Sequence, residues 1–496
     1  MSLAVVKSRT SLGIGAPPVL IETHISSGLP RFDIVGLPDT AIKESKHRVR
    51  SAIMNADFEF PMERITINLS PADLPKDGGR FDLAIALGIL VASGQLDATH
   101  LDQYECSGEL ALSGKLLPIK GMLPFALAAD APMIVAEKNA REACLPKTQP
   151  VYALPDLTTV CSHLKTPSIA PHTFSPPPMA DDYLVDLNEI HGQTLAKRAL
   201  EIAAAGQHHL LFVGPPGTGK TMLASRLPTV MPPMSQPEAM ELAAIYSTYE
   251  KSIEFDHLYR RPFRAPHHSA SSAALVGGGQ QPRAGEASLA HHGVLFLDEL
   301  PEFNRNVLEV LREPLESGHI CVSRANYRAE FPANFQLVAA MNPCPCGYFG
   351  DREHRCRCSP AQIQKYQTKL SGPLLDRIDI QVEVSRSGVS DDSTPESSAQ
   401  VRERVCKARE RQLARQGAVN GTLSGKKFSE ICELPGDERT FFQNSTRQLK
   451  LSLRSQHHIL KVARTIADLD AKPGIEHEHL CEAMLMRRLE SYMMRS

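Results

Sequence analysis

The eight residues GPPGTGKT at positions 214–221 constrain the fold of this chain more than any other stretch. They match the pattern G-x-x-x-x-G-K-[ST] and follow a short apolar run, HLLFVG, at 209–214. Such a loop, placed between a strand and a helix, surrounds phosphate oxygens with backbone N–H groups at the helix N-terminus. The lysine then reaches the β- and γ-phosphates, and the following hydroxyl holds Mg²⁺. The residues predicted to bind nucleotide are Gly214, Pro215, Pro216, Gly217, Thr218, Gly219, Lys220 and Thr221.

Two further apolar runs follow, GVLFLDE at 293–299 and FQLVAAMN at 335–342. Short runs of this kind, alternating with helical stretches, are typical of strands in a parallel α/β sheet that is buried on both faces. The first run ends in Asp298 and Glu299, which predicts one carboxylate for Mg²⁺ (with Thr221) and a second that polarises the attacking water. Asn342 ends the other run, and we expect it to orient the same water.

A chain of 496 residues is too long for one core and predicts about three domains. A Pro-rich stretch at 166–183 and a Ser- and Asp-rich stretch at 385–400 interrupt the periodic sequence and are interpreted as linkers. They leave an N-terminal domain at 1–165, an α/β core at 184–384 and a C-terminal domain at 401–496. The last of these carries apolar residues at helical spacing and is predicted to be helical.

The composition excludes some classes of protein. The formal net charge of −2 provides no overall attraction for nucleic acid, so DNA binding would need a local basic patch. No run of eighteen apolar residues and no secretion signal is present, so neither export nor a membrane span is expected. Of eleven cysteines, seven are scattered, which is typical of a reducing cytoplasm.

The other four cysteines lie close together in CPCGYFGDREHRCRC, at 344–358. Four thiolates are the number that a closed tetrahedral zinc site needs, although His354 could replace one of them. The alternative is four free thiols in an ordinary loop. A metal would crosslink an insertion of low apolar content beside Asn342, and the arginines on the insertion could also present charge to DNA. The predicted ligands are Cys344, Cys346, Cys356 and Cys358, and the arginines are Arg352, Arg355 and Arg357.

Two arginines are candidates for contacts with the transferred phosphoryl group. Arg377 lies in SGPLLDRID at 371–379, where it could act as an arginine finger supplied by a neighbouring subunit. The alternative is a local ion pair with Asp376 or Asp379. Arg464 lies in VARTIADL on a predicted helix, where a lid could contact the γ-phosphate.

In order, the motifs GPPGTGKT, VLFLDE, AAMNPCPCG, SGPLLDRID and VARTIADL resemble the magnesium-chelatase-like branch of AAA+ ATPases, and within it the ComM/YifB family of bacterial competence proteins. The resemblance covers essentially the whole chain. It implies a ring, usually a hexamer, with ATP and Mg²⁺ at subunit interfaces and a C-terminal helical lid. It also implies that Lys220, Thr221, Asp298, Glu299 and Asn342 act in their own subunit, that Arg377 acts in trans and that Arg464 is a second sensor. Two departures, AAAGQHH before the phosphate loop and RAGE at 283–286, do not touch the phosphate chemistry.

The N-terminal domain resembles the catalytic domain of Lon-type proteases, in LPKDGGRFDLAIALGIL at 74–90 and SGELALSGKLLPIKG at 107–121. Those proteases need a serine nucleophile and a lysine base. Arg80 and Leu123 stand at the corresponding positions, so we expect a noncatalytic domain without protease activity. Lys76, Arg80 and Lys120 could contact DNA or form an ordinary solvated surface.

Two segments are candidate DNA contacts. HICVSRANYRAEFP at 319–332 predicts a β-hairpin, which in the AAA+ branch that contains the MCM helicases projects into the pore. Arg324 and Arg328 could then meet phosphates, although a surface hairpin with two arginines is the alternative. Residues 444–467 form a local basic patch with five cations and no acid. These cations are Arg447, Lys450, Arg454, Lys461 and Arg464.

The resemblance favours an ATP-driven hexameric DNA motor, a helicase or branch-migration translocase that acts when transforming DNA is integrated by homologous recombination. Its expected partners are single-stranded and branched DNA, and recombinase-coated DNA. One alternative is a chelatase-type motor that remodels a partner inserting Mg²⁺ into a porphyrin. Another is a nucleotide-dependent DNA-binding module without a processive motor.

Overall fold

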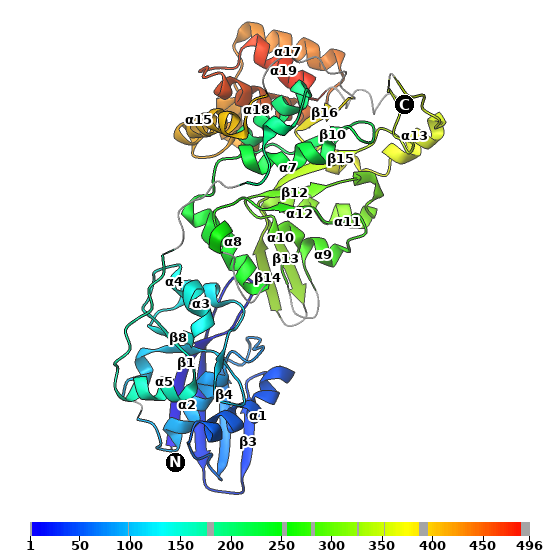
Figure 1. Cartoon of the computed structure of the whole chain (residues 1–496). Coiled ribbons are helices and arrows are strands. Elements are labelled where there is room, and N and C mark those ends of the chain that lie inside the picture. The colour runs from blue at the N-terminus through cyan, green and yellow to red at the C-terminus, as the bar shows by residue number, and fades with distance from the viewer. Residues whose placement is uncertain are drawn as a thin grey trace.

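The computed structural model describes residues 2–97, 99–175, 183–249, 255–278, 283–324, 327–351, 353–385 and 395–487. These residues form an N-terminal domain, an α/β core and a helical lid, which follow one another along the long axis of the molecule (Figure 1). No helix within the described ranges has the length and apolar character to cross a membrane.

The N-terminal domain is built on a seven-stranded mixed sheet in the order β3-β4-β2-β1-β5-β8-β9. Strand β2 pairs antiparallel with β1 and β4, and the other neighbours run parallel. The strands of this sheet are β1 (Ser2–Arg9), β2 (Pro18–Ser26), β3 (Arg31–Val35), β4 (Arg64–Ser70), β5 (Glu105–Ser107), β8 (Met133–Ala136) and β9 (Val151–Leu154). A separate two-stranded ribbon joins β6 (Glu109–Leu110) to β7 (Leu116–Leu117).

Alternating burial explains how this sheet holds its helices. In β2, the buried side chains are those of Val19, Ile21, Thr23 and Ile25, one on every second residue. Helix α2 packs on β1 and β2, and Gly88 permits its close approach, because a Cβ there would lie 2.3 Å from Thr23 Oγ1. The helices of the domain are α1 (Thr40–Asn55), α2 (Asp82–Ala92), α3 (Met122–Ala128), α4 (Ala140–Cys144) and α5 (Leu157–Lys165).

The core contains a five-stranded parallel sheet in the order β11-β12-β15-β10-β16. Its strands are β10 (Leu210–Val213), β11 (Phe263–Arg264), β12 (Val294–Leu297), β15 (Gln336–Met341) and β16 (Ile380–Glu383). The parallel α/β fold predicted from the apolar runs is therefore confirmed. The hairpin predicted at 319–332 is also present, as antiparallel β13 (His319–Arg324) and β14 (Tyr327–Pro332).

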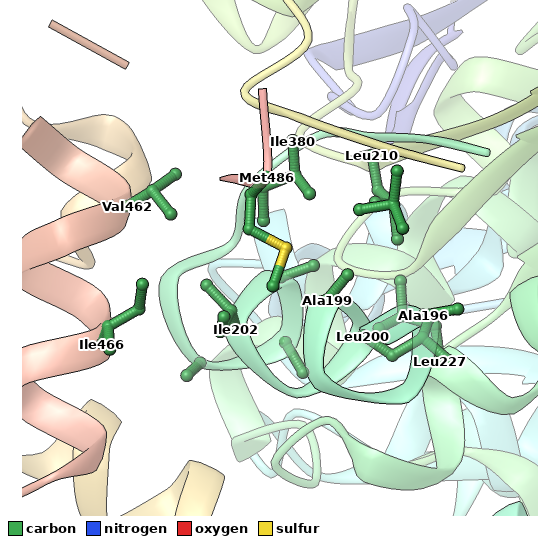
Figure 2. Packing of buried hydrophobic residues seen from close by; sticks show 14 of the residues in the cluster. Ala196, Ala199, Leu200, Ile202, Leu210, Leu227, Ile380, Val462, Ile466 and Met486 are labelled. Atoms are coloured by element: carbon green, nitrogen blue, oxygen red, sulfur yellow. The ribbon is translucent and has the colours of Figure 1, made fainter. Parts of the chain in front are cut away.

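The helices of the core flank this sheet and connect its strands. They are α6 (Thr194–Gly206), α7 (Lys220–Val230), α8 (Gln236–Tyr249), α9 (Ser272–Val276), α10 (Glu286–Leu289), α11 (Arg305–Glu309), α12 (Arg312–Ser317), α13 (Pro360–Gln367) and α14 (Gly372–Leu375). Figure 2 shows α6 between the sheet, represented by Leu210 and Ile380, and the lid, represented by Val462 and Ile466. One continuous apolar cluster thus joins core and lid.

The C-terminal domain is helical, as predicted. Its helices are α15 (Ser398–Gln416), α16 (Gly425–Ile431), α17 (Gly436–Gln448), α18 (Leu453–Leu469) and α19 (His477–Leu485). Helix α15 begins inside the stretch interpreted as a linker, because the Ser397 side chain accepts the Gln400 backbone N–H in a capping box.

The N-terminal domain contacts the core mainly through α3 and α8. Leu123 of α3 is fully buried in a cluster that contains Leu242 of α8. The Leu123 backbone N–H donates to Glu142 Oε1 at 3.1 Å and to Ser247 Oγ at 3.2 Å. A second contact brings Gly13 against β14, where a Cβ would lie 2.8 Å from the Glu330 carbonyl oxygen.

Candidate functional site

The phosphate loop lies at the C-terminal end of β10 and leads directly into α7. Gly217 and Gly219 have φ angles of 77° and 83°, a left-handed conformation that glycine adopts without steric cost. Gly214 has another reason to be glycine, because a Cβ there would lie 2.1 Å from the Val384 carbonyl oxygen of the neighbouring chain segment. The loop therefore needs glycine both for its turn and for its close packing against the sheet.

Lys220 joins the loop to the next strand. Its Nζ donates to the carbonyl oxygens of Gly214 and Pro215, each at 2.8 Å, and to Asn342 Oδ1 at 3.2 Å. Burial lowers the pKa of Lys220, while the charge of Asp298 acts in the opposite direction. A partly buried ammonium group surrounded by weak neutral acceptors is suited to a phosphate, which would replace those acceptors with anionic oxygens.

The carboxylates predicted at the end of β12 lie beside this loop. Thr221 Oγ1 donates to Asp298 Oδ2 at 2.7 Å, so a hydroxyl and a carboxylate suited to Mg²⁺ are already together. Glu299 follows with a φ angle of 51°, which is uncommon for a residue other than glycine. Its Oε2 lies 3.2 Å from His268 Nδ1, a contact that the sequence did not predict.

These groups surround a single cleft. Its volume is about 460 Å³, and its lining includes residues 216–222 together with Asp298, Glu299 and Asn342. The oxygens and the cation in this cleft fit a nucleotide phosphate chain with Mg²⁺. The structure thus brings together the predicted phosphate-loop, magnesium-binding and water-orienting residues.

Arg377 lies at the other end of the strands, where the N-terminal ends of β16 and β10 meet. It precedes β16, and the nearby Asp379 backbone N–H donates to the His209 carbonyl oxygen, just before β10 begins. Four residues of β10, about 13 Å of strand, therefore separate the level of Arg377 from the phosphate loop. Arg377 Nη2 pairs with Glu316, which is not one of the two acids expected as local partners.

A second arginine missed by the sequence analysis as a site residue shares that acid. Arg454, in the first turn of α18, has its Nη2 3.8 Å from Glu316 Oε1. The side chains of Arg454 and Glu316 are 43% and 57% exposed, whereas the side chain of Arg377 is only 6% exposed. The basic residues predicted in 444–467 gave the only signal for Arg454.

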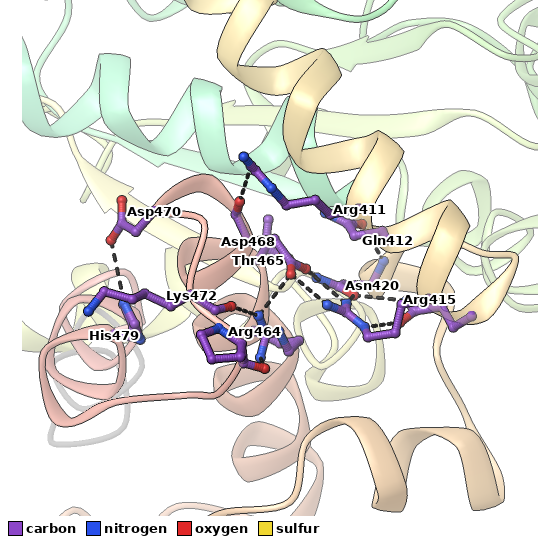
Figure 3. A network of polar contacts seen from close by, with 12 residues as sticks. Arg411, Gln412, Arg415, Asn420, Arg464, Thr465, Asp468, Asp470, Lys472 and His479 are labelled. Carbon is purple, nitrogen blue, oxygen red and sulfur yellow. Dashed lines mark hydrogen bonds and ion pairs between the residues drawn. The ribbon is translucent and has the colours of Figure 1, made fainter.

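Arg464 lies inside the lid (Figure 3), and it is not among the residues that line the cleft. Its Nη2 donates to Asp468 Oδ1 at 2.8 Å and to the Lys472 carbonyl oxygen at 2.7 Å. Burial would raise the pKa of Asp468, but hydrogen bonds from Arg415 and the charge of Arg464 lower it. Arg464 is 2% exposed and joins α18 to the loop that follows it, so its position provides no support for contact with the γ-phosphate.

The four cysteines predicted as metal ligands converge. The Sγ atoms of Cys344, Cys346 and Cys356 are 3.4–3.7 Å apart, and all four, with Cys358, lie within 4.8 Å of one another. A tetrahedral zinc site with Zn–S bonds of about 2.3 Å has sulfurs about 3.8 Å apart. Backbone N–H groups of Arg357 and Tyr348 lower the pKa of Cys346 to about 6. The donor set and its spacing fit zinc.

The cysteine loop also contacts the nucleotide site. A Cβ at Gly347 would lie 2.6 Å from Pro216 Cδ, so this loop packs directly on the phosphate loop. On the other side, the Asn342 backbone lies beside the Tyr366 hydroxyl of α13. Arg355 and Arg357 are exposed on the loop, whereas Arg352 lies outside the described residues.

A second group with metal-binding residue types is Glu241, His291 and His292. Glu241 Oε2 lies 3.2 Å and 2.8 Å from the Nε2 atoms of the two histidines. However, His291 Nδ1 accepts the Asn334 backbone N–H, which leaves the proton of the neutral ring on Nε2. His291 therefore donates to Glu241, and the group links α8 to the segment before β12 without a metal.

The structure describes the side chains of only some of the candidate DNA-contacting residues. The backbones of Arg324 and Arg328 belong to β13 and β14, but their side chains lie outside the described part of the chain. Lys76 donates to the Pro71 carbonyl oxygen, and Lys76 and Arg80 are 1% and 7% exposed. The expectation that these two residues lie at the surface is therefore wrong, whereas Lys120 is exposed and donates to the Tyr249 carbonyl oxygen.

Three family models together match almost the whole chain. Residues 186–391 match the model described as magnesium chelatase, subunit ChlI. Residues 21–148 match the model for subunit ChlI of Mg-chelatase, and residues 395–487 match that for the ChlI C-terminal region.

Similarity to individual proteins extends over the full length. Competence protein ComM of Haemophilus influenzae is 51% identical over 501 residues, which are 99% of this chain and 98% of that protein. The YifB proteins of Salmonella typhimurium and Escherichia coli are 47% and 46% identical, with the same coverage. Lon protease 2 of Bacillus subtilis is more distant, with 27% identity over 180 residues, 32% of each chain. The chain therefore belongs to the ComM/YifB family of magnesium-chelatase-like AAA+ proteins.

Proposed function

We propose that this protein is an ATP-driven, ring-shaped DNA motor, a helicase or branch-migration translocase that acts during integration of transforming DNA. The observation that carries the proposal is the separation of Arg377 from the cleft of its own subunit. An arginine finger at the far end of the strands can serve only a nucleotide held by a neighbour, as a ring with ATP at subunit interfaces requires. Family membership favours a hexamer.

Each group in the cleft has a chemical role in this proposal. Lys220 binds the β- and γ-phosphates, Thr221 and Asp298 hold Mg²⁺, and Glu299 takes a proton from the attacking water while Asn342 orients it. Bound Mg²⁺ supplies neutralisation of phosphate charge. From the next subunit, Arg377 stabilises charge on the transferred group, and Arg454 lies at the same face and shares its acid.

The assignment of DNA as substrate rests on three features. The relative with 51% identity is named a competence protein. The β13–β14 hairpin extends from the core, where Arg324 and Arg328 would meet phosphates in a pore. The lid carries exposed cations on α17 and α18. Single-stranded, branched and recombinase-coated DNA are the proposed partners.

We further propose that Cys344, Cys346, Cys356 and Cys358 hold one structural zinc ion, which fixes the loop between Asn342 and α13. The contact between Gly347 and Pro216 supports this role, because a loop that shifts there also shifts the phosphate loop.

The deciding experiment measures ATP hydrolysis with and without single-stranded and branched DNA, and in parallel the resolution of a labelled four-way junction. We expect DNA to stimulate hydrolysis and the junction to be resolved only with hydrolysable ATP. Stimulation without strand movement would favour a DNA-binding module without a processive motor. An ATP hydrolysis rate that is the same with and without DNA would favour a chelatase-type motor, the class that the three family descriptions name.

A further inference from the structure

A buried polar cluster joins the core to the lid at the start of β10. His208 Nε2 lies 2.8 Å from Thr465 Oγ1 of α18. The Thr465 hydroxyl donates to the Lys461 carbonyl oxygen at 3.0 Å, so it accepts from His208, and the Nε2 of that ring carries a proton. Gly206 makes room for this contact, because a Cβ there would lie 2.2 Å from His208 Nε2. The AAAGQHH stretch at 203–209, which has no part in the phosphate chemistry, thus helps to dock the lid.

Asp379 is the acid of this cluster. Its Oδ2 accepts the His209 backbone N–H at 3.0 Å and lies 3.6 Å from His208 Nδ1, and its Oδ1 is hydrogen-bonded to His458 Nδ1 of α18. The side chains of His458 and Asp379 are only 12% and 6% exposed. Burial would raise the pKa of Asp379, but the charge of His458 holds it well below its ordinary value. The carboxylate is therefore ionised, and it depends on its partners because a buried charge without them is costly.

These contacts locate the segment that carries Arg377. Arg377 precedes Asp379 by two residues, and its own side chain contacts nearby groups. Its Nη1 donates to the Pro373 carbonyl oxygen of α14 at 2.5 Å, and its Nη2 pairs with Glu316. Neither contact fixes the segment on the lid, since Pro373 lies in the same segment and the Glu316 side chain is 57% exposed. The Asp379 carboxylate does so through a buried contact.

One face of α18 meets both residues. Arg454 and His458 are four residues apart on this helix and so lie on the same face. Arg454 Nη2 lies 3.8 Å from Oε1 of Glu316, the acid that pairs with Arg377, while His458 contacts Asp379. Two contacts thus connect α18 to this segment, one partly exposed and one buried. The buried contact is the one suited to hold the segment in place, because exposed ion pairs contribute little.

We propose that Asp379 and His458 are positioning residues for Arg377. Their contact ties the segment that carries Arg377 to α18 and holds the guanidinium where it can serve the nucleotide of the next subunit. This inference rests on the proposed function, because it assumes that Arg377 acts across a subunit interface. The phosphate loop lies at the other end of the strands, so loss of the contact should leave the subunit's own cleft intact.

The experiment breaks the contact from both sides in the full-length protein. We expect His458→Phe and Asp379→Ala each to lower kcat for ATP about 10-fold or more, because a displaced guanidinium stabilises the transferred group poorly. The affinity for a fluorescent ATP analogue should be unchanged. His458→Asn keeps an N–H donor near the position of Nδ1 and should recover a substantial part of kcat. The double change His458→Phe with Asp379→Ala leaves neither charge alone, and it should lose no more than either single change.

Mixed rings separate a positioning role from a folding defect. Mixing His458→Phe with Lys220→Ala subunits should restore hydrolysis, because one subunit supplies the intact phosphate loop and the other a correctly held Arg377. Mixing His458→Phe with Arg377→Ala subunits should restore nothing, because both defects affect the same arginine. The matched control is His457→Phe, which should leave kcat unchanged. His457 is the next residue, but its ring packs on Phe428 within the lid, with ring centroids 4.6 Å apart.

Normal kcat in His458→Phe, or equal losses in His458→Phe and His458→Asn, would overturn the role of this contact. Loss of analogue binding would also overturn it, because the contact would then support the fold of its own subunit. If Arg377→Ala is rescued by Lys220→Ala subunits but His458→Phe is not, the positioning role fails while Arg377 still acts in trans. If neither is rescued, the arrangement across subunits is wrong, and the proposed function falls with the inference.

Discussion

At the scale of single residues, Lys220 connects the two polypeptide segments that must act together on a phosphate. Its ammonium group contacts two loop carbonyl oxygens and the amide oxygen of Asn342. Burial already lowers its pKa, which means that the charged form is incompletely stabilised by its neighbours. Anionic phosphate oxygens would supply that stabilisation, and the site should lose its affinity when the cation is removed.

Substitution of two residues should separate nucleotide binding from hydrolysis. We expect Lys220→Ala to abolish binding of a fluorescent ATP analogue, because the cation for the phosphates is lost. Glu299→Gln should bind the analogue normally and release phosphate very slowly, because an amide cannot take a proton from water. Glu302→Gln, one turn further along, is the matched control. Wild-type phosphate release by Glu299→Gln would refute the role of that carboxylate.

A buried acid between the N-terminal domain and α8 predicts a pH effect on stability. Burial raises the pKa of Glu142 to about 7, although Ser247, Leu123 and Asn139 all donate to it. Because this pKa lies above the unfolded value near 4.5, the folded chain holds the extra proton between these two values. The contribution to stability is therefore greatest below about pH 4.5 and falls as the pH rises through 7.

Glu142→Gln removes this dependence. Relative to wild type, we expect its free energy of unfolding to rise between pH 5 and pH 8, by at most about 3 kcal/mol. Urea denaturation of both proteins at the two pH values measures the difference. Glu137→Gln, an exposed change in the same segment, should differ from wild type equally at both. A pH-independent effect of Glu142→Gln would show that Glu142 is ionised in the folded protein throughout this range.

The phosphate-loop and strand-end residues of the site could be predicted from the sequence, because local pattern alone puts them at the C-terminal edge of a parallel sheet. His268, Glu316 and Arg454 could not. Their contacts depend on which strands are neighbours and on where the lid docks, and neither is encoded in a short motif. Arg464 illustrates the same limit, because its helix was predicted but the side of that helix facing the lid interior was not.

At the scale of elements, the cysteine loop has few buried residues of its own. Half of its described residues are exposed, and among the described residues of 343–359 only Cys344 and Gly347 are buried. A metal ion bound by the four converging thiols would supply the stability that apolar contacts do not give this loop. The loop joins β15 to α13, so its conformation determines how Asn342 is held at the cleft.

Purified protein should therefore carry about one zinc ion per chain, measured by elemental analysis. Zinc should leave on chelation or acidification, because thiolate ligands must be deprotonated to bind. Changing Cys356 and Cys358 together to Ser should remove the metal and lower ATP hydrolysis and DNA binding together. Cys481→Ser, on α19, is the control that keeps the metal. A metal-free preparation with full activity would identify the four cysteines as free thiols.

Among the elements, those with strong local signals were predicted and those that depend on distant pairing were not. The apolar runs at β10, β12 and β15 indicated buried strands, and helical spacing indicated α15 and α18. Strand order in the seven-stranded sheet was beyond prediction, because it is set by pairings such as that of β1 with β5, nearly 100 residues apart. The same holds for the docking of α3 on α8.

At the scale of the whole molecule, the N-terminal domain contacts two parts of the core, helix α8 and the β13–β14 hairpin. Helix α8 contacts Leu123 and also, through Glu241, the histidines just before β12. The segment around Gly13 packs on β14 of the hairpin. Leu123, which the sequence analysis aligned with the lysine of Lon-type proteases, is thus part of an internal interface.

Ring assembly is tested most directly through Arg377. If this residue serves the nucleotide of a neighbour, Arg377→Ala rings should bind ATP nearly normally and hydrolyse it poorly. Mixing Arg377→Ala with Lys220→Ala subunits should then restore activity. About a quarter of the interfaces formed by random mixing pair an intact phosphate loop with an intact arginine.

The matched control for this experiment is a mixture of Lys220→Ala with Glu299→Gln subunits, measured by phosphate release at equal total protein. Both of those defects lie in the cleft of their own subunit, so every site in the mixed ring keeps one of them and no activity should return. Recovery in the first mixture but not in the second would mean that the two ends of the strands of one sheet serve two different nucleotides. Without recovery in the first, Arg377 would act in its own subunit or not at all, and its pairing with Glu316 would be a structural contact.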